Sequence, residues 1–169
     1  MKSKKYISII LTNIFVLLVI LFLSDAFTKF EIKNQTIKSF VYIGILILTP
    51  LVIIWNIVTF KFEQNKIFIF LFSVMIFIGI LIIDPIKIIF SSSTWKTQTI
   101  LYQNKRSKFK KIEFQMRDMG VLGYKRRTVE VTYITDLFII VKSVEDDVEK
   151  RIEWIKINKD INELGLKGP

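Results

Sequence analysis

The sequence predicts a membrane α-helical anchor of three transmembrane helices, followed by a small antiparallel β-meander domain with a short C-terminal helix. The chain of 169 residues is 51% hydrophobic and only 24% charged, with a mean hydropathy of +0.45, which is too apolar for an ordinary soluble domain. The apolar residues gather in long runs that end at Ile83, and beyond them apolar and polar residues alternate. We therefore expect a transmembrane region at residues 1–84, a juxtamembrane linker at residues 85–93 and a polar β-rich domain at residues 94–169.

Three apolar runs are long enough to cross a bilayer. They occupy residues 6–24, 40–60 and 67–83, and a hydrocarbon core of about 30 Å needs about 20 helical residues, with about 17 to 25 tolerated. The segments between them, residues 25–39 and 61–66, are polar and short. Neighbouring helices must therefore run antiparallel.

The first run also resembles a signal peptide in two respects. Lysines precede it, and residues 24–26 (Ser-Asp-Ala) have the spacing of small residues that signal peptidase accepts. The run is longer than the roughly 7 to 15 apolar residues of a signal-peptide core. We favour a retained helix, and removal of residues 1–26 stays open.

Polar residues inside the runs are few. Asn13 and Asn56 carry amides that lipid cannot satisfy, so we expect them to face neighbouring helices and contribute to helix–helix packing. Pro50 deletes one backbone hydrogen bond and should kink the second helix. No Asp, Glu, Lys or Arg lies within the three spans, which argues against a proton or ion pathway.

The flanks of the first helix predict the orientation. Lys2, Lys4 and Lys5 precede this helix, whereas Asp25 follows it, and positive residues favour the cytoplasmic side. Three crossings then place the C-terminal domain outside. Counted over all flanks, these three lysines included, the lysines divide equally between the two sides, so this orientation depends on the first helix. An Ile-, Lys- and Asn-rich chain whose only alanine is Ala26 is typical of an AT-rich genome, and we expect a multi-pass protein of the bacterial inner membrane.

In the second half of the chain, apolar and polar residues alternate with a period of two, which is typical of β-strands. A change in the apolar face near Thr99 indicates a β-bulge, and Gly120 and Gly123 permit a tight connection. A continuous apolar run is typical of a strand covered on both faces. The strands are expected at residues 94–103, 112–117, 126–134 and 137–141.

The sequence allows two secondary structures for residues 145–157, a strand or a helix. The acidic residues at 145–147 either form the turn of a hairpin that returns through residues 151–157, or begin a helix with Val148, Ile152 and Ile155 on one face. We favour the strand because Ile152 and Trp154 alternate with charged residues. Residues 158–164 are expected to form the short terminal helix.

Two basic loops are the candidate binding residues. Such loops suit lipid phosphates, nucleic acid or an acidic protein, and Phe109 is placed to insert among lipid headgroups. If the two loops meet at one end of the sheet, they form one patch; if they do not, each is a solvated hairpin tip. The candidates are Lys105, Arg106, Lys108, Phe109, Lys110 and Lys111 in the first loop, and Lys125, Arg126 and Arg127 in the second.

The composition excludes most enzyme chemistry. The chain has no Cys and no His, so it lacks a thiolate nucleophile, an imidazole base and the usual zinc ligands. Ser107 beside Lys108 is an exposed pair rather than a catalytic dyad. The acidic residues at 145–149 lack the spacing of a Ca²⁺ loop. We predict no catalytic residue, metal site or cofactor.

The sequence thus favours a non-catalytic membrane protein whose β domain binds a protein partner. Accessory subunits of envelope complexes and membrane immunity proteins that neutralise a toxin share this profile. The alternative is a membrane-anchored module that binds anionic lipid headgroups or another polyanion through the basic loops. Nucleic acid is not an expected partner for a domain outside the cell.

Overall fold

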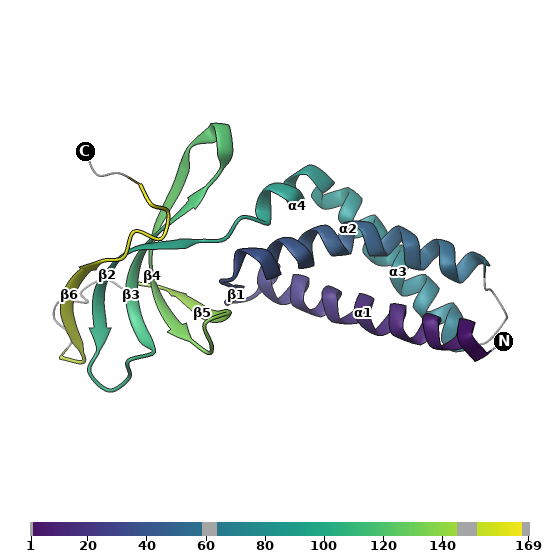
Figure 1. The fold of residues 1–169 in the computed structure, drawn as a ribbon, viewed down its shortest axis with the longest axis horizontal. Coiled ribbons are helices and arrows are strands. Elements are labelled where there is room, and N and C mark those ends of the chain that lie inside the picture. The colour runs from purple at the N-terminus through teal and green to yellow at the C-terminus, as the bar shows by residue number, and fades with distance from the viewer. Residues whose placement is uncertain (1, 59–63, 145–151, 167–169) are drawn as a thin grey trace. The chain divides into compact units, whose positions relative to one another are not determined.

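A computed structural model describes residues 2–58, 64–144 and 152–166 of the chain, which forms two compact units (Figure 1). The helical unit comprises Met1–Leu23 and Ser39–Ser92. The sheet unit comprises Ser24–Lys38 and Ser93–Pro169. The segment between the first two helices therefore belongs to the same compact unit as the C-terminal half of the chain, although the sequence indicated only a polar connection there.

The helical unit is built from long apolar helices, as predicted. Two of them, α1 (Lys2–Phe27) and α2 (Gln35–Val58), are long and apolar enough to cross a membrane. The third, α3 (Gln64–Ile83), joins the short helix α4 (Pro85–Ser91) through a bend of 82°. This bent pair is the third candidate span.

The bend between α3 and α4 has a local cause. Asp84 adopts a φ of 80°, in the left-handed region that few non-glycine residues occupy. Its carboxylate accepts a hydrogen bond from the Ile86 amide at 2.9 Å and caps α4. Pro85 occupies the first turn, where the missing amide hydrogen costs nothing.

Aromatic and small residues pack the helices together. Phe15 of α1 meets Phe72 of α3 edge to face, and Phe22 of α1 meets Tyr42 of α2 in the same manner. A methyl group added at Gly44 would lie 2.8 Å from Leu18 Cδ1, so α1 and α2 approach closely there. Outward-facing residues such as Ile10, Ile54 and Ile82 are large and apolar and remain exposed, as a lipid-facing surface requires.

The two asparagines predicted to join helices have different environments. Asn56 is buried, and its side-chain amide donates to the carbonyl of Val52 in its own helix at 2.8 Å. Asn13 is exposed on α1. Pro50 lies inside α2, which continues through it.

The sheet unit is one antiparallel sheet of six strands in the order β1-β5-β4-β3-β2-β6. Four consecutive strands form the predicted meander, and β2 carries the predicted bulge as a register shift between Thr97 and Thr99. The strands are β1 (Phe30–Ile32), β2 (Lys96–Asn104), β3 (Lys110–Asp118), β4 (Tyr124–Tyr133), β5 (Phe138–Ser143) and β6 (Trp154–Asp160).

Strand β1 comes from the segment between α1 and α2. It pairs with β5, and the ladder extends past it on both sides, since the Val141 amide donates to the Lys29 carbonyl and the Lys33 amide to that of Leu137. Ile32 is buried. Residues 30–33 (Phe-Glu-Ile-Lys) alternate with the period of a strand, but the run is too short to identify by pattern alone.

Strand β6 confirms the favoured strand near residue 154 and corrects its pairing. It pairs with β2 rather than returning along β5. The predicted terminal helix at residues 158–164 is wrong: Asn158 and Asn162 adopt a φ of 48°, and the amides of Ile161 and Asn162 donate to the Gln98 carbonyl. The acidic turn at residues 145–149 lies outside the described residues.

An aliphatic cluster on one face of the sheet forms its core. Val129, Val131, Ile139 and Val141 lie side by side on β4 and β5 and are nearly inaccessible, and Tyr133 packs against them. The same face continues across β3 into polar residues that are equally buried.

Candidate functional site

The most distinctive site of the sheet unit is a group of polar side chains buried against β3. Glu113 and Gln115 of β3 are both 0% exposed. A buried charge is costly unless it is paired and hydrogen-bonded, so the partners of Glu113 determine what the site is. We call the group the buried polar cluster: Glu31, Lys33, Thr97, Glu113, Gln115, Arg127, Tyr133 and Glu163.

Lys33 and Glu113 are joined through two hydroxyl groups. Lys33 Nζ donates to Tyr133 Oη at 2.6 Å and to Thr97 Oγ1 at 3.2 Å. Both hydroxyls in turn donate to the Glu113 carboxylate at 2.8 Å. The third donor position of Lys33 faces Glu163 at 3.0 Å. Each charge therefore has hydrogen-bonded partners although both charges are removed from water.

Arg127 of β4 forms the other half of the cluster. Its guanidinium binds Glu31 of β1 in a bidentate pair at 2.7 and 2.6 Å. It also donates to Gln115 Oε1 at 3.0 and 2.8 Å, and it lies 4.1 Å from the centre of the Trp95 ring. These contacts tie β1, β3 and β4 together.

The surroundings of Tyr133 and Lys33 keep both groups protonated. Burial raises the pKa of Tyr133 to about 12, assisted by the nearby Glu113 carboxylate. Burial alone lowers the pKa of Lys33, but its hydrogen bond and attraction to Tyr133 and the carboxylates of Glu163 and Glu113 reverse this, so the pKa is raised. A protonated phenol and a protonated amine are poor bases and poor nucleophiles.

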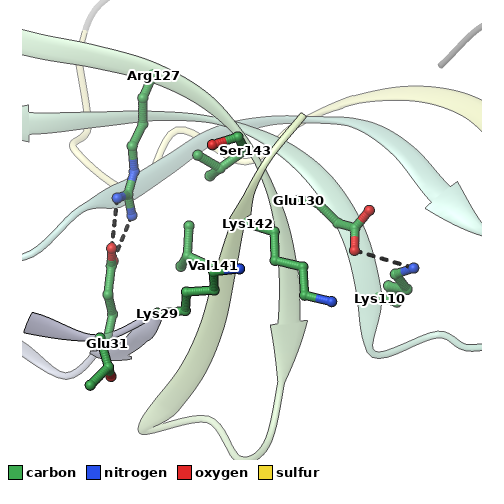
Figure 2. A pocket seen from close by; sticks show the side chains of 10 residues that line it. Lys29, Glu31, Lys110, Arg127, Glu130, Val141, Lys142 and Ser143 are labelled. Carbon is green, nitrogen blue, oxygen red and sulfur yellow. Dashed lines mark hydrogen bonds and ion pairs between the residues drawn. The ribbon is translucent and has the colours of Figure 1, made fainter. Parts of the chain in front are cut away.

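A hollow of about 620 Å³ lies beside the cluster at the end of β5 (Figure 2). The Arg127–Glu31 pair lies on one side of Val141 and Lys142, and the Lys110–Glu130 pair, at 3.2 Å, lies on the other. Glu130 and Lys142 share the opposite sheet face from Val129 and Val141. Residues from both faces of the sheet therefore line the hollow, and most of them are charged. The lining of a typical small-molecule site is predominantly apolar.

The first predicted basic loop connects β2 to β3. Lys105, Arg106, Lys108 and Phe109 are exposed there. Lys110 pairs with Glu130 and lies over the Trp154 ring. Lys111, the last residue of the predicted loop, places its ammonium group 4.9 Å from the centre of the Tyr133 ring.

The second predicted basic cluster lies at the opposite end of β3 and β4. Lys110 is opposite Thr132, whereas Arg117 is opposite Lys125, so the strands separate the two clusters by seven residues, or roughly 20 Å. Lys125 and Arg126 are exposed, but Arg127 is held inside the buried polar cluster. The fold does not bring the two basic clusters into one patch.

Sequence reasoning missed most members of the buried polar cluster. Arg127 was a candidate only as part of a basic run. Glu113 and Gln115 occupy the polar face of a correctly predicted strand, and that face is buried because Glu31 and Lys33 arrive from the segment between α1 and α2. The one signal in the sequence was the short alternation at residues 30–33.

The contacts of the buried polar cluster join β1, β2, β3 and β4. Among residues 2–58, 64–144 and 152–166, no group of three or more acidic, His or Cys side chains is arranged to hold a metal ion. Comparisons with protein-family models, with curated proteins and with solved structures gave no match to this chain.

Proposed function

We propose that this chain is a non-catalytic protein of the bacterial inner membrane whose sheet unit, outside the cell, binds a protein partner. Three helical crossings anchor it in this proposal. The observation that carries the proposal is the edge strand β6, whose apolar residues Ile155 and Ile157 are 49% and 40% exposed.

The pairing of β1 with β5 supports the third crossing, because it fixes whether the number of crossings between these strands is even or odd. Residues 24–38 and 93–166 form one sheet, since β1 pairs with β5, so both segments must lie on the same side of the membrane. Helix α2 leaves that side, and the chain must cross again before residue 93 to return to it. Helix α3 is the segment with the length and apolarity for that return.

A disulfide tests this parity because the chain contains no cysteine of its own. Phe30 and Ile140 are directly opposite and form a non-hydrogen-bonded pair, since the flanking bonds join Lys29 with Val141, and such pairs have the close Cα spacing that a disulfide needs. The variant Phe30→Cys/Ile140→Cys should form an intramolecular disulfide in detergent with added oxidant. As a control, Phe30→Cys/Thr132→Cys places the second thiol one strand further away and should remain reduced. Failure of the first pair to link would refute the same-side arrangement.

A partner chain has a clear way to bind β6. Its outer edge pairs with no strand among the described residues, and an unpaired edge presents backbone donors and acceptors to an incoming strand. Ile155 and Ile157 supply apolar contact on one side of that edge. The exposed lysines of β6 bias the choice towards an acidic or neutral strand.

The absence of a catalytic role is supported by the state of the polar side chains. Lys33, Glu113 and Tyr133 are ionisable groups at the centre of the buried polar cluster, and each of them is engaged by hydrogen bonds. The raised pKa values of Lys33 and Tyr133 keep both groups protonated, so neither accepts a proton from a substrate nor attacks it. The chemistry that remains to an exposed edge strand is recognition.

Photo-cross-linking in native membranes tests the partner. A photoreactive residue at Ile157 should give one discrete adduct, and the same residue at Asp136, in the exposed β4–β5 turn, should not. The substitution Ile155→Lys/Ile157→Lys should abolish the adduct and co-purification together, because charges on an edge strand oppose strand addition. A chain that purifies from mild detergent without a stoichiometric partner, and that gives no adduct at Ile157, would overturn the proposal.

A further inference from the structure

The hollow at the end of β5 carries more positive than negative charge. Both of its carboxylates are already engaged, Glu31 by Arg127 and Glu130 by Lys110. Two further cations then have no counter-ion inside the hollow, and an excess of positive charge in a concave surface attracts anions. The charged residues that line it are four cations, Lys29, Lys110, Arg127 and Lys142, and two carboxylates, Glu31 and Glu130.

Lys29 and Lys142 hold the two uncompensated charges. Within residues 2–58, 64–144 and 152–166, neither ammonium group has an ion-pair or hydrogen-bond partner. Lys142 is directly opposite Glu130 on β4, but that carboxylate pairs with Lys110 instead. Figure 2 shows the two ion pairs as dashed lines, whereas Lys29 and Lys142 have none. Both lysines are exposed, so an anion in the hollow can reach them.

The hollow lies at an edge of the sheet that β1 leaves uncovered. The Val141 amide donates to the Lys29 carbonyl, and two residues further along β5 the position opposite Ser143 falls to Phe27, which belongs to α1. Alternate amides of a strand point to the same side, so the Ser143 amide points to this edge, as that of Val141 does. Because β5 forms the edge here, a ligand can contact Lys29 on one sheet face and Lys142 on the other.

Other polar groups of the hollow suit a ligand larger than a single ion. The Ser143 hydroxyl is part of the lining. Glu130 uses one carboxylate oxygen for Lys110, and its other oxygen can accept a hydrogen bond from a ligand hydroxyl. The volume of about 620 Å³ lies within the range of about 300 to 1,000 Å³ that is usual for small-molecule sites. A charged lining of this size calls for a charged organic ligand.

We propose that this hollow binds a small organic dianion, whose oxyanion oxygens accept hydrogen bonds from Lys29, Lys142 and the Ser143 amide. Two negative charges balance the two uncompensated ammonium groups, and charge-assisted hydrogen bonds are stronger than neutral ones. Phosphate monoesters and dicarboxylates are the dianions available near neutral pH. All lining residues belong to the sheet unit, so the site depends neither on the partner of β6 nor on the orientation in the membrane.

Isothermal titration calorimetry of the full chain in a neutral detergent, at low and constant ionic strength, tests the site with two probes. Glycerol 3-phosphate carries both charges on one group, and succinate carries them on two. At least one probe should bind a single saturable site with a Kd below about 1 mM, and the tighter probe shows whether the two lysines converge on one group.

Lys29→Gln and Lys142→Gln should each weaken binding about tenfold, the scale of one charge-assisted hydrogen bond. The matched control is Lys159→Gln, an exposed lysine of β6 at the opposite edge of the sheet, which should bind as the native chain does. Because the three lysines are exposed, each variant should unfold thermally within about 2 °C of the native chain, so a loss of affinity is attributable to the hollow.

No saturable binding of either probe would overturn the inference. Equal weakening by Lys159→Gln would overturn it as well, since it would show attraction to the overall positive charge of the chain rather than to the hollow. The same conclusion would follow if acetate, with one charge, bound as tightly as the two dianions.

Discussion

Glu113 is the residue on which the charge balance of the sheet unit depends. Its carboxylate is wholly buried and accepts hydrogen bonds from Tyr133, Thr97 and Gln115. The first two of these donors also accept hydrogen bonds from Lys33. Removing this negative charge takes away one of two carboxylates that balance the Lys33 ammonium group, and the other, Glu163, is partly exposed. The loss is therefore more damaging than losing one hydrogen bond.

We predict that Glu113→Gln lowers the free energy of unfolding by about 3 kcal/mol, the scale on which breaking a buried pair destabilises a protein. The amide keeps the shape of the side chain but supplies no charge to Lys33. Denaturant unfolding in detergent, followed by Trp fluorescence, measures the change. The matched control is Glu153→Gln, at an exposed position, where a change within about 0.5 kcal/mol is expected. Equal losses in the two variants would contradict the role given to Glu113.

Tyr133 gives the sheet unit an alkaline limit. Its pKa in the folded chain is about 12 against an ordinary value of 10.0, so the folded state holds the phenolic proton more tightly than the unfolded state. This contribution to stability is complete below pH 10 and is lost as the pH rises towards 12. The raised pKa of Lys33 acts in the same direction above 10.5.

We predict that stability falls above pH 10 in the native chain and falls less in Tyr133→Phe, where the phenolic proton is absent. Both proteins are titrated with base while the absorbance of tyrosinate is recorded. Subtracting the curve of Tyr133→Phe from that of the native chain gives the titration of the Tyr133 phenol alone. Its midpoint should be near 12 in folded protein. A midpoint near 10, the ordinary value for this side chain, would show that Tyr133 is solvated.

At the scale of elements, sequence patterns predicted the helices and strands that depend mainly on local interactions. The hydropathy of α1 and α2 and the alternation of β3 and β4 were sufficient to predict them. Strand β1 was not predictable because its three residues gain stability from β5, more than a hundred positions away. The same dependence explains the pairing of β6 with β2 and the burial of Glu113, since a polar strand face is solvent-exposed only if nothing covers it.

The closest helix contact gives a prediction at this scale. A side chain at Gly44 of α2 meets Leu18 of α1, whereas nothing lies within 4 Å of the corresponding position at Gly79 of α3. Gly44→Leu should therefore destabilise the helical unit by about 1 to 3 kcal/mol through overpacking, and Gly79→Leu should have little effect. Thermal unfolding in detergent compares the two variants. A larger loss for Gly79→Leu would show that α1 and α2 do not approach at Gly44.

At the scale of the whole molecule, the two compact units are interleaved along the chain. The sheet unit takes residues 24–38 from between α1 and α2 and residues from 93 onwards after α4. A buried ion pair between Lys38 and Asp25, at 3.0 Å, joins the end of α1 to the start of α2 within the sheet unit. The sheet is therefore complete only when both segments emerge on the same side, so insertion into the membrane and folding of the sheet are coupled.

The side on which the sheet unit emerges follows from the lysines before α1, and we predict that it is outside the cell. The variant Phe30→Cys/Ile140→Cys separates orientation from pairing, because a disulfide persists in the oxidising envelope and is reduced in the cytoplasm. The expected result is a disulfide that forms in growing cells without added oxidant. An alkaline phosphatase fused to the C-terminus should be active in the same strain background. A variant that links only after purification and oxidation, together with an inactive fusion, would place the sheet unit in the cytoplasm while leaving the pairing of β1 with β5 intact.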